Sequence, residues 1–409
     1  MQIRAITIGL QQRPTPDLAS LRRAAEFGNA ARDAFEQQGL VVQSVRLAAQ
    51  PISQVIPSGS PNAAVAYARA MDRAIADSGI DYCSLGPALA SAPGREHGLI
   101  DAIDPILRET DRSFVSVMAA TLRDGVNLGS VWRTAGALVA MAKGDAQATR
   151  ARRFTVSALV PPHGPFFPSA YHRGARMGFS LAMEAADLAV EAFTEAATID
   201  LAQSRLIDAM ETACGPVQRL GEELERRYGV RFWGMDISLA PFPDAARSIA
   251  GAFERLGVDI FGAHGTLFAT ALTTDALRRV RVRTCGFSGL MLPLIEDSVM
   301  AERHRQGRYD IIDLLLYSSV CGAGLDTVPL PGNTTQSQIA SVYLDLCTLA
   351  LKLRKPLTVR LMPMPGKAAG DPVEFDFPYF APTTVVALGA ASNRGLFDKG
   401  SWNPHSGSA

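Results

Sequence analysis

The stretch SSVCGAGLDTVPLPGNT, residues 318–334, combines a thiol, a carboxylate and several glycines. A thiol among exposed backbone N–H groups can have a lowered pKa and act as a nucleophile. We therefore expect Cys321 to be a nucleophile or proton donor and Asp326 to be the carboxylate that orients it. The backbone of Gly322 and Gly324 would then bind substrate. The alternative is a tight turn in a packed core, because free cysteines are usually buried.

Histidine side chains form a second set of chemical groups. His163 and His172 lie in the loop PPHGPFFPSAYHRG, and His264 lies between glycines in GAHGT. Because an imidazole titrates near neutral pH, it can donate or accept a proton during catalysis. We expect His172 and His264 to be acid/base groups and His163 to bind substrate. The alternative, strongest for His163, is a surface loop without a chemical role.

Arg46 and Arg360 lie in otherwise apolar segments, QSVRLA and TVRLMP. A guanidinium binds a carboxylate through two parallel hydrogen bonds, so both residues are expected to bind a substrate carboxylate. Cys83 precedes a Gly-Pro pair near the end of a predicted strand. Ligands of parallel-sheet enzymes often bind at that end, which makes Cys83 a further substrate-binding candidate.

Carboxylates within apolar sequence suggest a weaker, metal-binding interpretation. Asp236 lies inside FWGMDISLAP, and Glu296 follows the apolar run in LPLIED. Together with His264 and Asp326 they could supply oxygen and nitrogen ligands to a divalent cation. Their spacing matches no histidine-based zinc motif. Helix caps and buried hydrogen-bond acceptors are the alternative, and the cofactor stays unknown at this stage.

Two other cofactor classes receive no support from the sequence. The order of glycines in GAGLD differs from a dinucleotide-binding fingerprint, and no phosphate-binding P-loop motif occurs. The stretch RTCGF, residues 283–287, is similar to a glycyl-radical signature. That signature normally lies near the C-terminus, whereas here over a hundred residues follow it. We therefore expect neither a nucleotide-binding motif nor a glycyl radical.

Alternating strands and helices must position these groups. Strands are predicted at residues 3–9, 41–49, 80–86, 112–120, 152–161, 230–239, 324–330 and 357–364. Helical patterns lie between most of them, with a clear helix over 336–353 and a long helical region over 181–227. This alternation predicts an α/β protein with parallel strands and helical crossovers. We expect residues 1–395 to form a single large domain, and a doubly wound parallel sheet is one architecture that fits.

Composition bounds the protein class. The chain has 40 basic and 40 acidic residues, so no net charge favours nucleic acid or an anionic membrane as a partner. Five cysteines without a C-x-x-C pair argue against a disulfide framework or a thiolate zinc site. The start, MQIRAITIGLQQRP, lacks the pattern of a signal peptide. We expect a cytoplasmic protein that binds neither nucleic acid nor membranes, with a flexible tail over residues 396–409.

Several motifs occur in a recognisable order: IRAITIGL, QSVRLA, MDISLAPFPDAA, GAHGT, GFSGLMLPLIED, CGAGLDTVPLPGNT and TVRLMPMPGKAAGDPVEF. Together they resemble domain-of-unknown-function family 711 of bacteria and archaea, over about residues 2–390. Two departures occur. Residues 332–334 read Gly-Asn-Thr where one branch of the family has Gly-Asp-Thr, and MGFSLAMEAADLAVEA drifts from a strand pattern into a helical one.

The resemblance implies a fold similar to pyruvate formate-lyase, a closed α/β barrel of about ten strands with outer helices and an internal finger loop. Residues 318–334 would be that finger and would carry Cys321 to the barrel centre. We expect a homo-oligomeric enzyme that uses acid/base or covalent cysteine chemistry on a carboxylate- or carbonyl-bearing metabolite in a central cavity. A non-catalytic metabolite sensor and a divalent-metal-dependent hydrolase or lyase stay open as alternatives.

Overall fold

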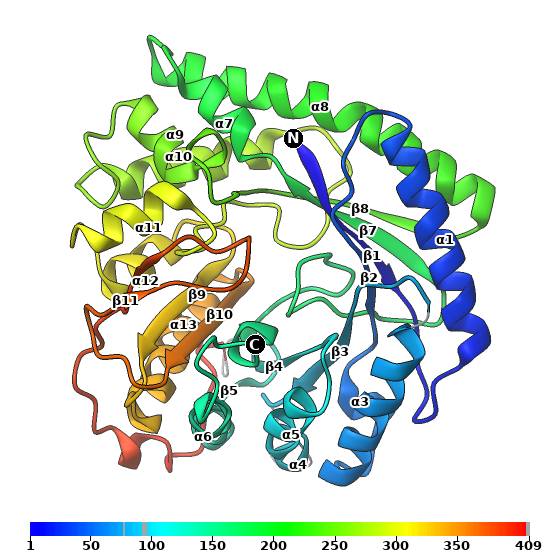
Figure 1. Cartoon of the computed structure of the whole chain (residues 1–409). Helices are drawn as coiled ribbons and strands as arrows, with labels where there is room; N and C mark the ends of the chain where they lie inside the picture. The colour runs from blue at the N-terminus through cyan, green and yellow to red at the C-terminus, as the bar shows by residue number, and fades with distance from the viewer. Residues whose placement is uncertain (77, 92–95, 406–409) are drawn as a thin grey trace.

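The computed structural model describes residues 1–76, 78–91 and 96–405. One large sheet runs through the molecule (Figure 1). Its main strands, in spatial order, are β8 (Arg231–Ala240), β7 (Gly178–Glu184), β1 (Gln2–Gly9), β2 (Val45–Ala48), β3 (Tyr82–Leu89), β4 (Ser113–Thr121), β6 (Phe154–Ala158), β10 (Leu357–Met364) and β9 (Gly324–Pro331). The α/β class and the mostly parallel pairing predicted from the alternating pattern are therefore confirmed.

The strands run in two directions. Five neighbours, β1, β2, β3, β4 and β6, are parallel to one another. The pairs β7–β8 and β9–β10 are each internally parallel but meet the central five antiparallel, through β7–β1 and β10–β6. This mixed sheet differs from the all-parallel, doubly wound alternative. The pairing of these strands is an open path from β8 to β9, so a closed barrel does not follow from it.

Helices lie around the outside of the curved sheet (Figure 1). They are α1 (Leu18–Glu36), α2 (Ile52–Val55), α3 (Pro61–Ala76), α4 (His97–Asp101), α5 (Ile103–Arg108), α6 (Leu128–Ala142), α7 (Ala186–Phe193), α8 (Ile199–Tyr228), α9 (Ile249–Leu256), α10 (Thr266–Arg279), α11 (Ser298–Arg305), α12 (Ile311–Ser318) and α13 (Gln336–Leu353). Local sequence sets their ends: Asp17 caps α1, Thr198 caps α8, and Thr335 with Gln338 forms a capping box on α13.

Alternating side chains give the sheet two different faces. The outer face packs against the helices in a large apolar core. The inner face carries a separate, small cluster: Ala5, Phe166, Ala182, Ala240, Met291 and Ala323. Because most of these side chains are single methyl groups, they leave space inside the curve of the sheet.

The loop inside this curve is residues 159–177, between β6 and β7 (Figure 1). The Thr7 hydroxyl donates to the Pro165 carbonyl at 2.8 Å, and the Ser84 hydroxyl donates to the Ala170 carbonyl at 2.7 Å. Residues 318–334, expected to be an internal finger, instead end α12, form a turn and continue into β9. The finger assignment was wrong because β9 is a sheet strand paired with β10.

Two further expectations need correction. The long helical region predicted over residues 181–227 begins with β7, which pairs with β1 and β8 on both edges, so tertiary pairing overrides its helical composition. The segment from residue 396 was expected to be flexible, yet Phe397 is buried and β13 (Ser401–Trp402) pairs with β5 (Gly125–Asn127). Residues 406–409 of that expected tail lie outside the described residues.

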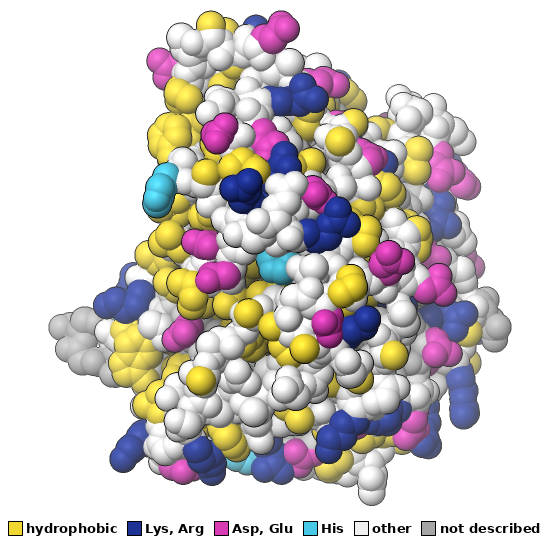
Figure 2. Space-filling view, turned by 60° about the vertical axis from the view of Figure 1, so that its left-hand side comes forward, with side chains coloured by type: hydrophobic (Ala, Val, Ile, Leu, Met, Phe, Trp, Pro, Cys, Tyr) yellow, Lys and Arg dark blue, Asp and Glu magenta, His cyan; other side chains and the backbone are white. Residues whose placement is uncertain are grey.

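The surface shows no block of one charge on the face of Figure 2, where basic and acidic side chains alternate with apolar ones. Among the described residues, every helix is too short or too polar to cross a bilayer.

Candidate functional site

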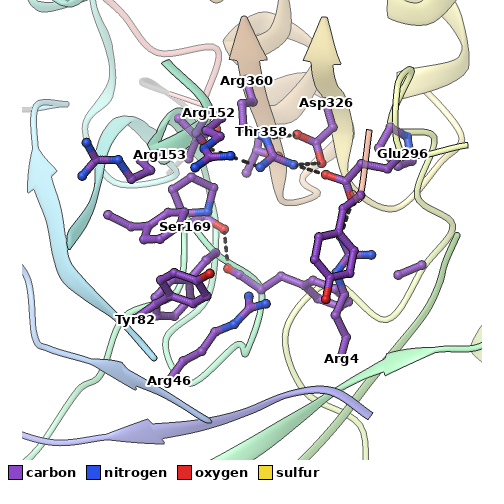
Figure 3. Close-up of a pocket in the computed structure, with 18 of the residues that line it drawn as sticks. Arg4, Arg46, Tyr82, Arg152, Arg153, Ser169, Glu296, Asp326, Thr358 and Arg360 are labelled. Carbon is purple, nitrogen blue, oxygen red and sulfur yellow. Dashed lines mark hydrogen bonds and ion pairs between the residues drawn. The ribbon is translucent and has the colours of Figure 1, made fainter. Parts of the chain in front are cut away.

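A pocket of about 190 Å³ lies within the curve of the sheet (Figure 3). Its wall includes Arg4 of β1, Arg46 of β2, Tyr82 of β3, Phe114 of β4 and Thr155 of β6. Each of these residues is among the first three of its strand. The pocket is therefore at the amino ends of the five parallel strands, opposite to the end at which open parallel sheets usually bind ligands.

A β-bulge brings two of the predicted residues together. Val359 of β10 pairs with Leu325 of β9, but Leu361 pairs with Val328, so two residues of β9 oppose Arg360 alone. The Nε and Nη2 atoms of Arg360 donate to the two carboxylate oxygens of Asp326 at 2.6 and 2.9 Å. Arg360 and Asp326 are thus a bidentate pair on neighbouring strands, and both line the pocket.

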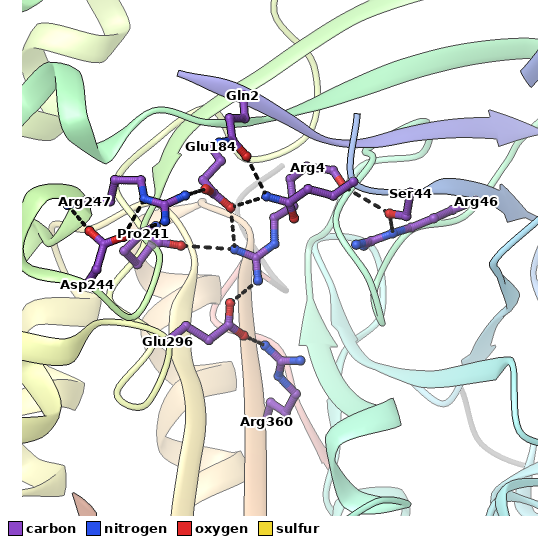
Figure 4. A network of polar contacts seen from close by, with 11 residues as sticks. Gln2, Arg4, Ser44, Arg46, Glu184, Pro241, Asp244, Arg247, Glu296 and Arg360 are labelled. Atoms are coloured by element: carbon purple, nitrogen blue, oxygen red, sulfur yellow. Dashed lines mark hydrogen bonds and ion pairs between the residues drawn. The ribbon is translucent and has the colours of Figure 1, made fainter. Parts of the chain in front are cut away.

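Glu296 extends this pair into a network (Figure 4). It accepts a 2.6 Å hydrogen bond from Nη2 of Arg360 and a second hydrogen bond from Arg4. Arg4 also lies 3.9 Å from Glu184, which in turn pairs with Arg247 at 3.0 Å. Alternating cations and anions therefore cross the interior of the sheet from β10 to β7.

The network shifts the pKa of each member. Burial acts to lower the pKa of Arg360, but Asp326 and Glu296 together hold it above its usual value. Burial also acts to raise the pKa of Glu296, yet Arg4 and Arg360 hold it below its usual value. For Asp326 the balance is reversed: burial and repulsion from Glu296 raise its pKa against the attraction of Arg360. Of the two carboxyl groups, Asp326 is thus the one that takes up a proton more readily.

Three pocket arginines, Arg46, Arg152 and Arg153, stand outside the network. Within the described part of the chain, Arg46 and Arg152 form no ion pair with a carboxylate. Arg46 donates from Nε to the Ser44 hydroxyl at 2.9 Å, and its guanidinium lies 5.3 Å from the ring centre of Phe167. Arg152 lies 4.2 Å from the ring centre of Phe377. Burial lowers the pKa of Arg46, to about 10, with repulsion from Arg4 in the same direction, and burial also lowers the pKa of Arg152.

Arg153 lines the same pocket, but its hydrogen bonds are made within the fold. Its guanidinium donates to the backbone carbonyls of Leu107, Thr110, Ser113 and Thr149, at distances from 2.6 to 3.1 Å. These four bonds satisfy it within the fold. Among the described residues, Arg46 and Arg152 have no such set of acceptors, so their N–H groups are available to an anion in the pocket.

The structure places Cys321 away from this pocket. Its side chain is buried in the apolar core, and its sulfur accepts a hydrogen bond from the Gly324 N–H at 3.4 Å. A Cβ on Gly322 would lie 2.5 Å from Cα of Gly289, and one on Gly324 would lie 2.4 Å from the Thr358 carbonyl oxygen. Close backbone packing explains both glycines. Cys321 and Asp326 therefore do not form the expected pair.

Cys83 and His264 also lie elsewhere. Side chains alternate between the two faces of a strand, and Tyr82 faces the pocket. Its neighbour Cys83 therefore points to the other face and lies in the apolar core against the helices. Burial raises the pKa of its thiol, which stays protonated at neutral pH. His264 is exposed at the turn before α10. Neither residue belongs to the pocket wall.

His163 and His172 of the inner loop contact each other, and neither of them lines the pocket. The ring centre of His163 lies 4.0 Å from that of Trp233, stacked, and 5.2 Å from that of His172. Burial lowers the pKa of His163, to about 4, helped by His172 and Arg173, and burial also lowers the pKa of His172. Both imidazoles are thus neutral at physiological pH.

The suggested metal ligands are not gathered at one point. Asp236 is fully buried and accepts hydrogen bonds from the Ser238 hydroxyl and from the N–H groups of Phe287, at 2.7 Å, and Ser288, at 3.0 Å. Glu296 lies between two guanidinium groups. Among the described residues, no three or more His, Cys, Asp or Glu side chains are grouped so that they could hold a metal ion. Asp236 is instead explained as the acceptor that holds the backbone turn at residues 286–288.

The burial of Asp236 predicts a pH effect on stability. Burial raises its pKa from 3.8 to about 6, against the hydrogen bonds from Ser238, Phe287 and Ser288. Since the folded state then binds the proton more tightly than the unfolded state, the contribution is favourable below pH 4 and is lost as pH rises to 6. Denaturant unfolding at pH 4 and pH 7 should show wild type losing roughly 2 kcal/mol relative to Asp236→Asn. Equal pH slopes for the two proteins would contradict this.

Sequence reasoning missed several residues of the wall. Arg4 and Arg152 lie in or beside apolar strands, as Arg46 and Arg360 do, so the same signal was present in IRAITIGL and RRFTV. The rings of Phe377, Tyr379 and Phe380 come from EFDFPYF, more than two hundred residues after Arg152. No local pattern connects that segment with the pocket. Of the predicted site residues, Arg46, Arg360, Asp326 and Glu296 are the ones that meet there.

Comparison with known proteins agrees with the motif pattern. The family described as "Uncharacterised ACR (DUF711)" matches residues 1–380. A UPF0210 protein of Pyrobaculum arsenaticum is 32% identical over 399 residues, which cover 91% of this chain and 87% of the relative. UPF0210 proteins of Desulforudis audaxviator, at 31%, and Methanosarcina barkeri, at 29%, cover 86% and 92% of this chain and 80% and 88% of their own lengths. The chain therefore belongs to the uncharacterised family DUF711.

Proposed function

We propose that this protein is an enzyme that binds a small carboxylate-bearing metabolite in the pocket and acts on it by acid/base chemistry. The observation that carries the proposal is the pair of arginines, Arg46 and Arg152, without ion-pair partners in the described structure. A largely enclosed cation without a counter-ion is unfavourable, and a bound carboxylate would compensate it. We infer that these two guanidinium groups bind the substrate carboxylate.

Asp326 is the proposed acid/base group. It shares the pocket with both arginines, and its pKa is raised. A carboxyl group of this kind can give a proton to a substrate carbonyl oxygen or remove one from an adjacent carbon. Arg360 fixes its orientation through two hydrogen bonds. Cys321, in the apolar core, has no part in this scheme.

We also infer that the fold closes into a barrel of ten strands. Residues 283–294 support this, because they connect the two edge strands. The Cys285 N–H donates to the Met235 carbonyl of β8, and the Leu294 N–H donates to the Asp326 carbonyl of β9. Each of these hydrogen bonds lies at or next to an isolated parallel β-bridge, Met235 with Thr284 at one end and Pro293 with Asp326 at the other. Counting this segment as a strand would give five strands in each direction around the pocket.

Two variants, Asp326→Asn and Cys321→Ala, test whether the reaction depends on the Asp326 carboxyl group or on the Cys321 thiol. First, a panel of metabolite carboxylates is screened for thermal stabilisation of the wild type and for product formation by mass spectrometry. On a substrate so found, Asp326→Asn should lower kcat by about 100-fold or more, the usual contribution of a general acid or base. Cys321→Ala should keep kcat within a few-fold.

The outcomes separate the alternatives. Carboxylates that stabilise the protein without being converted would favour a metabolite sensor over an enzyme. A loss of kcat in Cys321→Ala, with Asp326→Asn unaffected, would return the chemistry to the thiol. If no carboxylate binds the wild type, the proposal fails. Circular dichroism of both variants checks that each is folded under assay conditions.

A further inference from the structure

The pocket wall is unusually rich in aromatic rings. Eight of its 27 lining residues are aromatic, whereas aromatic residues make up only 7% of the chain. These eight are Tyr82, Phe114, Phe166, Phe167, Phe287, Phe377, Tyr379 and Phe380. They come from β3, β4, the inner loop, residues 283–294 and the C-terminal region. Rings from five separate parts of the chain therefore converge on one small space.

The rings form two groups, and each group carries one of the free arginines. Phe114 packs edge-on against Tyr82 and Phe167, at 5.5 and 5.3 Å between ring centres, and Arg46 lies over both of these rings. Phe377 packs against Tyr379 and Phe380, at 5.3 and 4.9 Å, and Arg152 lies over Phe377. A guanidinium stacked on a ring keeps its N–H edges free for an anion.

The hydroxyl groups in the wall are mostly occupied. The Thr358 hydroxyl donates to the Ala323 carbonyl at 3.0 Å, that of Ser169 to the Phe166 carbonyl at 3.3 Å, and that of Ser44 to the Arg4 carbonyl at 2.9 Å. Those of Tyr82 and Tyr379 make no hydrogen bond to other described residues. Few of the wall's hydroxyl groups are therefore free to pair with a ligand, and its other polar side chains are mostly charged.

We propose, resting on the function proposed above, that the substrate is an aromatic carboxylate: a planar ring that bears one acidic group. The carboxylate binds between Arg46 and Arg152, and the ring packs edge-to-face or offset against the two aromatic groups. The free hydroxyls of Tyr82 and Tyr379 can accept or donate one hydrogen bond each to a polar ring substituent. A pocket of about 190 Å³ suits one such ring.

Calorimetric titration of the wild type with matched acids tests this class. The panel is benzoate, phenylacetate, cyclohexanecarboxylate, succinate, acetate and inorganic phosphate. Benzoate or phenylacetate should bind at least tenfold more tightly than acetate, succinate and phosphate. Either should also bind several-fold more tightly than cyclohexanecarboxylate, which has the same charge and a similar size but lacks a planar ring. Phe167→Leu and Phe377→Leu should each weaken the binding of benzoate and phenylacetate several-fold more than they weaken the binding of acetate.

The results also distinguish this inference from the proposed function. If succinate, phosphate or cyclohexanecarboxylate binds as tightly as benzoate and phenylacetate, the substrate is not an aromatic carboxylate. If the competitor is succinate or cyclohexanecarboxylate, the proposal that the pocket binds a carboxylate still holds. Absence of binding by every acid would overturn both. The two phenylalanine variants belong to separate segments, so one remains informative if the other fails to fold, and the wild-type comparison needs neither.

Discussion

Replacing Arg360 with methionine is expected to lower the free energy of unfolding by about 3–5 kcal/mol, because it removes the cation that lies between the buried carboxylate of Glu296 and the largely buried carboxylate of Asp326. Arg360 donates two hydrogen bonds to Asp326 and one to Glu296, and its side chain is only 11% exposed. Methionine has a similar length but no charge, so Asp326 would lose its only ion-pair partner among the described residues. Denaturant unfolding at pH 7 measures the loss.

Arg152→Met is the matched control for this measurement. Arg152 lines the same pocket and has the same side chain, but it forms no ion pair with the described residues. Its removal should cost only about 0.5–1 kcal/mol, the contribution of its contact with Phe377. Adding Asp326→Asn to Arg360→Met should recover part of the lost stability, since one uncompensated charge is then gone. Equal losses in Arg360→Met and Arg152→Met would show that the network contributes nothing.

Replacing Arg46 with glutamine is expected to weaken the binding of a carboxylate ligand by about 100-fold, or roughly 2–3 kcal/mol. The reason is that glutamine keeps a hydrogen-bond donor but loses the charge and the planar fork of donors. Because Arg46 forms no ion pair with the described residues, its replacement should leave the free energy of unfolding without ligand within about 1 kcal/mol of wild type. Calorimetric titration and denaturant unfolding measure the two quantities.

Two further variants show whether the effect belongs to the pocket. Arg123→Gln removes the same charge at a side chain that is 90% exposed, and should leave binding unchanged. Arg46→Lys keeps the charge without the fork and should recover only part of the affinity. A loss in Arg123→Gln as large as that in Arg46→Gln would mean that general electrostatic attraction, and not the pocket, determines binding.

Part of the site could be predicted from the sequence by one physical rule. A charged residue inside an apolar strand is unfavourable unless it is paired or used, so Arg46 and Arg360 could be selected without a structure. The rule holds because it depends only on local burial, which the strand pattern already indicates. Applied consistently, it would also have selected Arg4 in IRAITIGL.

The rest depended on which face each side chain occupies. Tyr82 and Cys83 are neighbours in one strand, yet Tyr82 lines the pocket and Cys83 lies in the core against the helices. Shifting the strand register by one residue would exchange the two faces. Strand boundaries predicted from sequence are not accurate to one residue, so the sequence could not assign these faces. Cys321 was selected because small residues surround it. In the structure those residues are small because backbones pack closely there, as at Gly322.

By itself, the sequence determined the family, the α/β class, most strands and helices, and the presence of charges within apolar strands. Only the tertiary structure decided the partners. The bulge in β9 places Asp326 opposite Arg360, and the course of the chain brings Phe377 onto Arg152. These are contacts between residues far apart in the sequence. Local composition carries no information on register or on long-range neighbours, so the pocket became visible only when the strands were assembled.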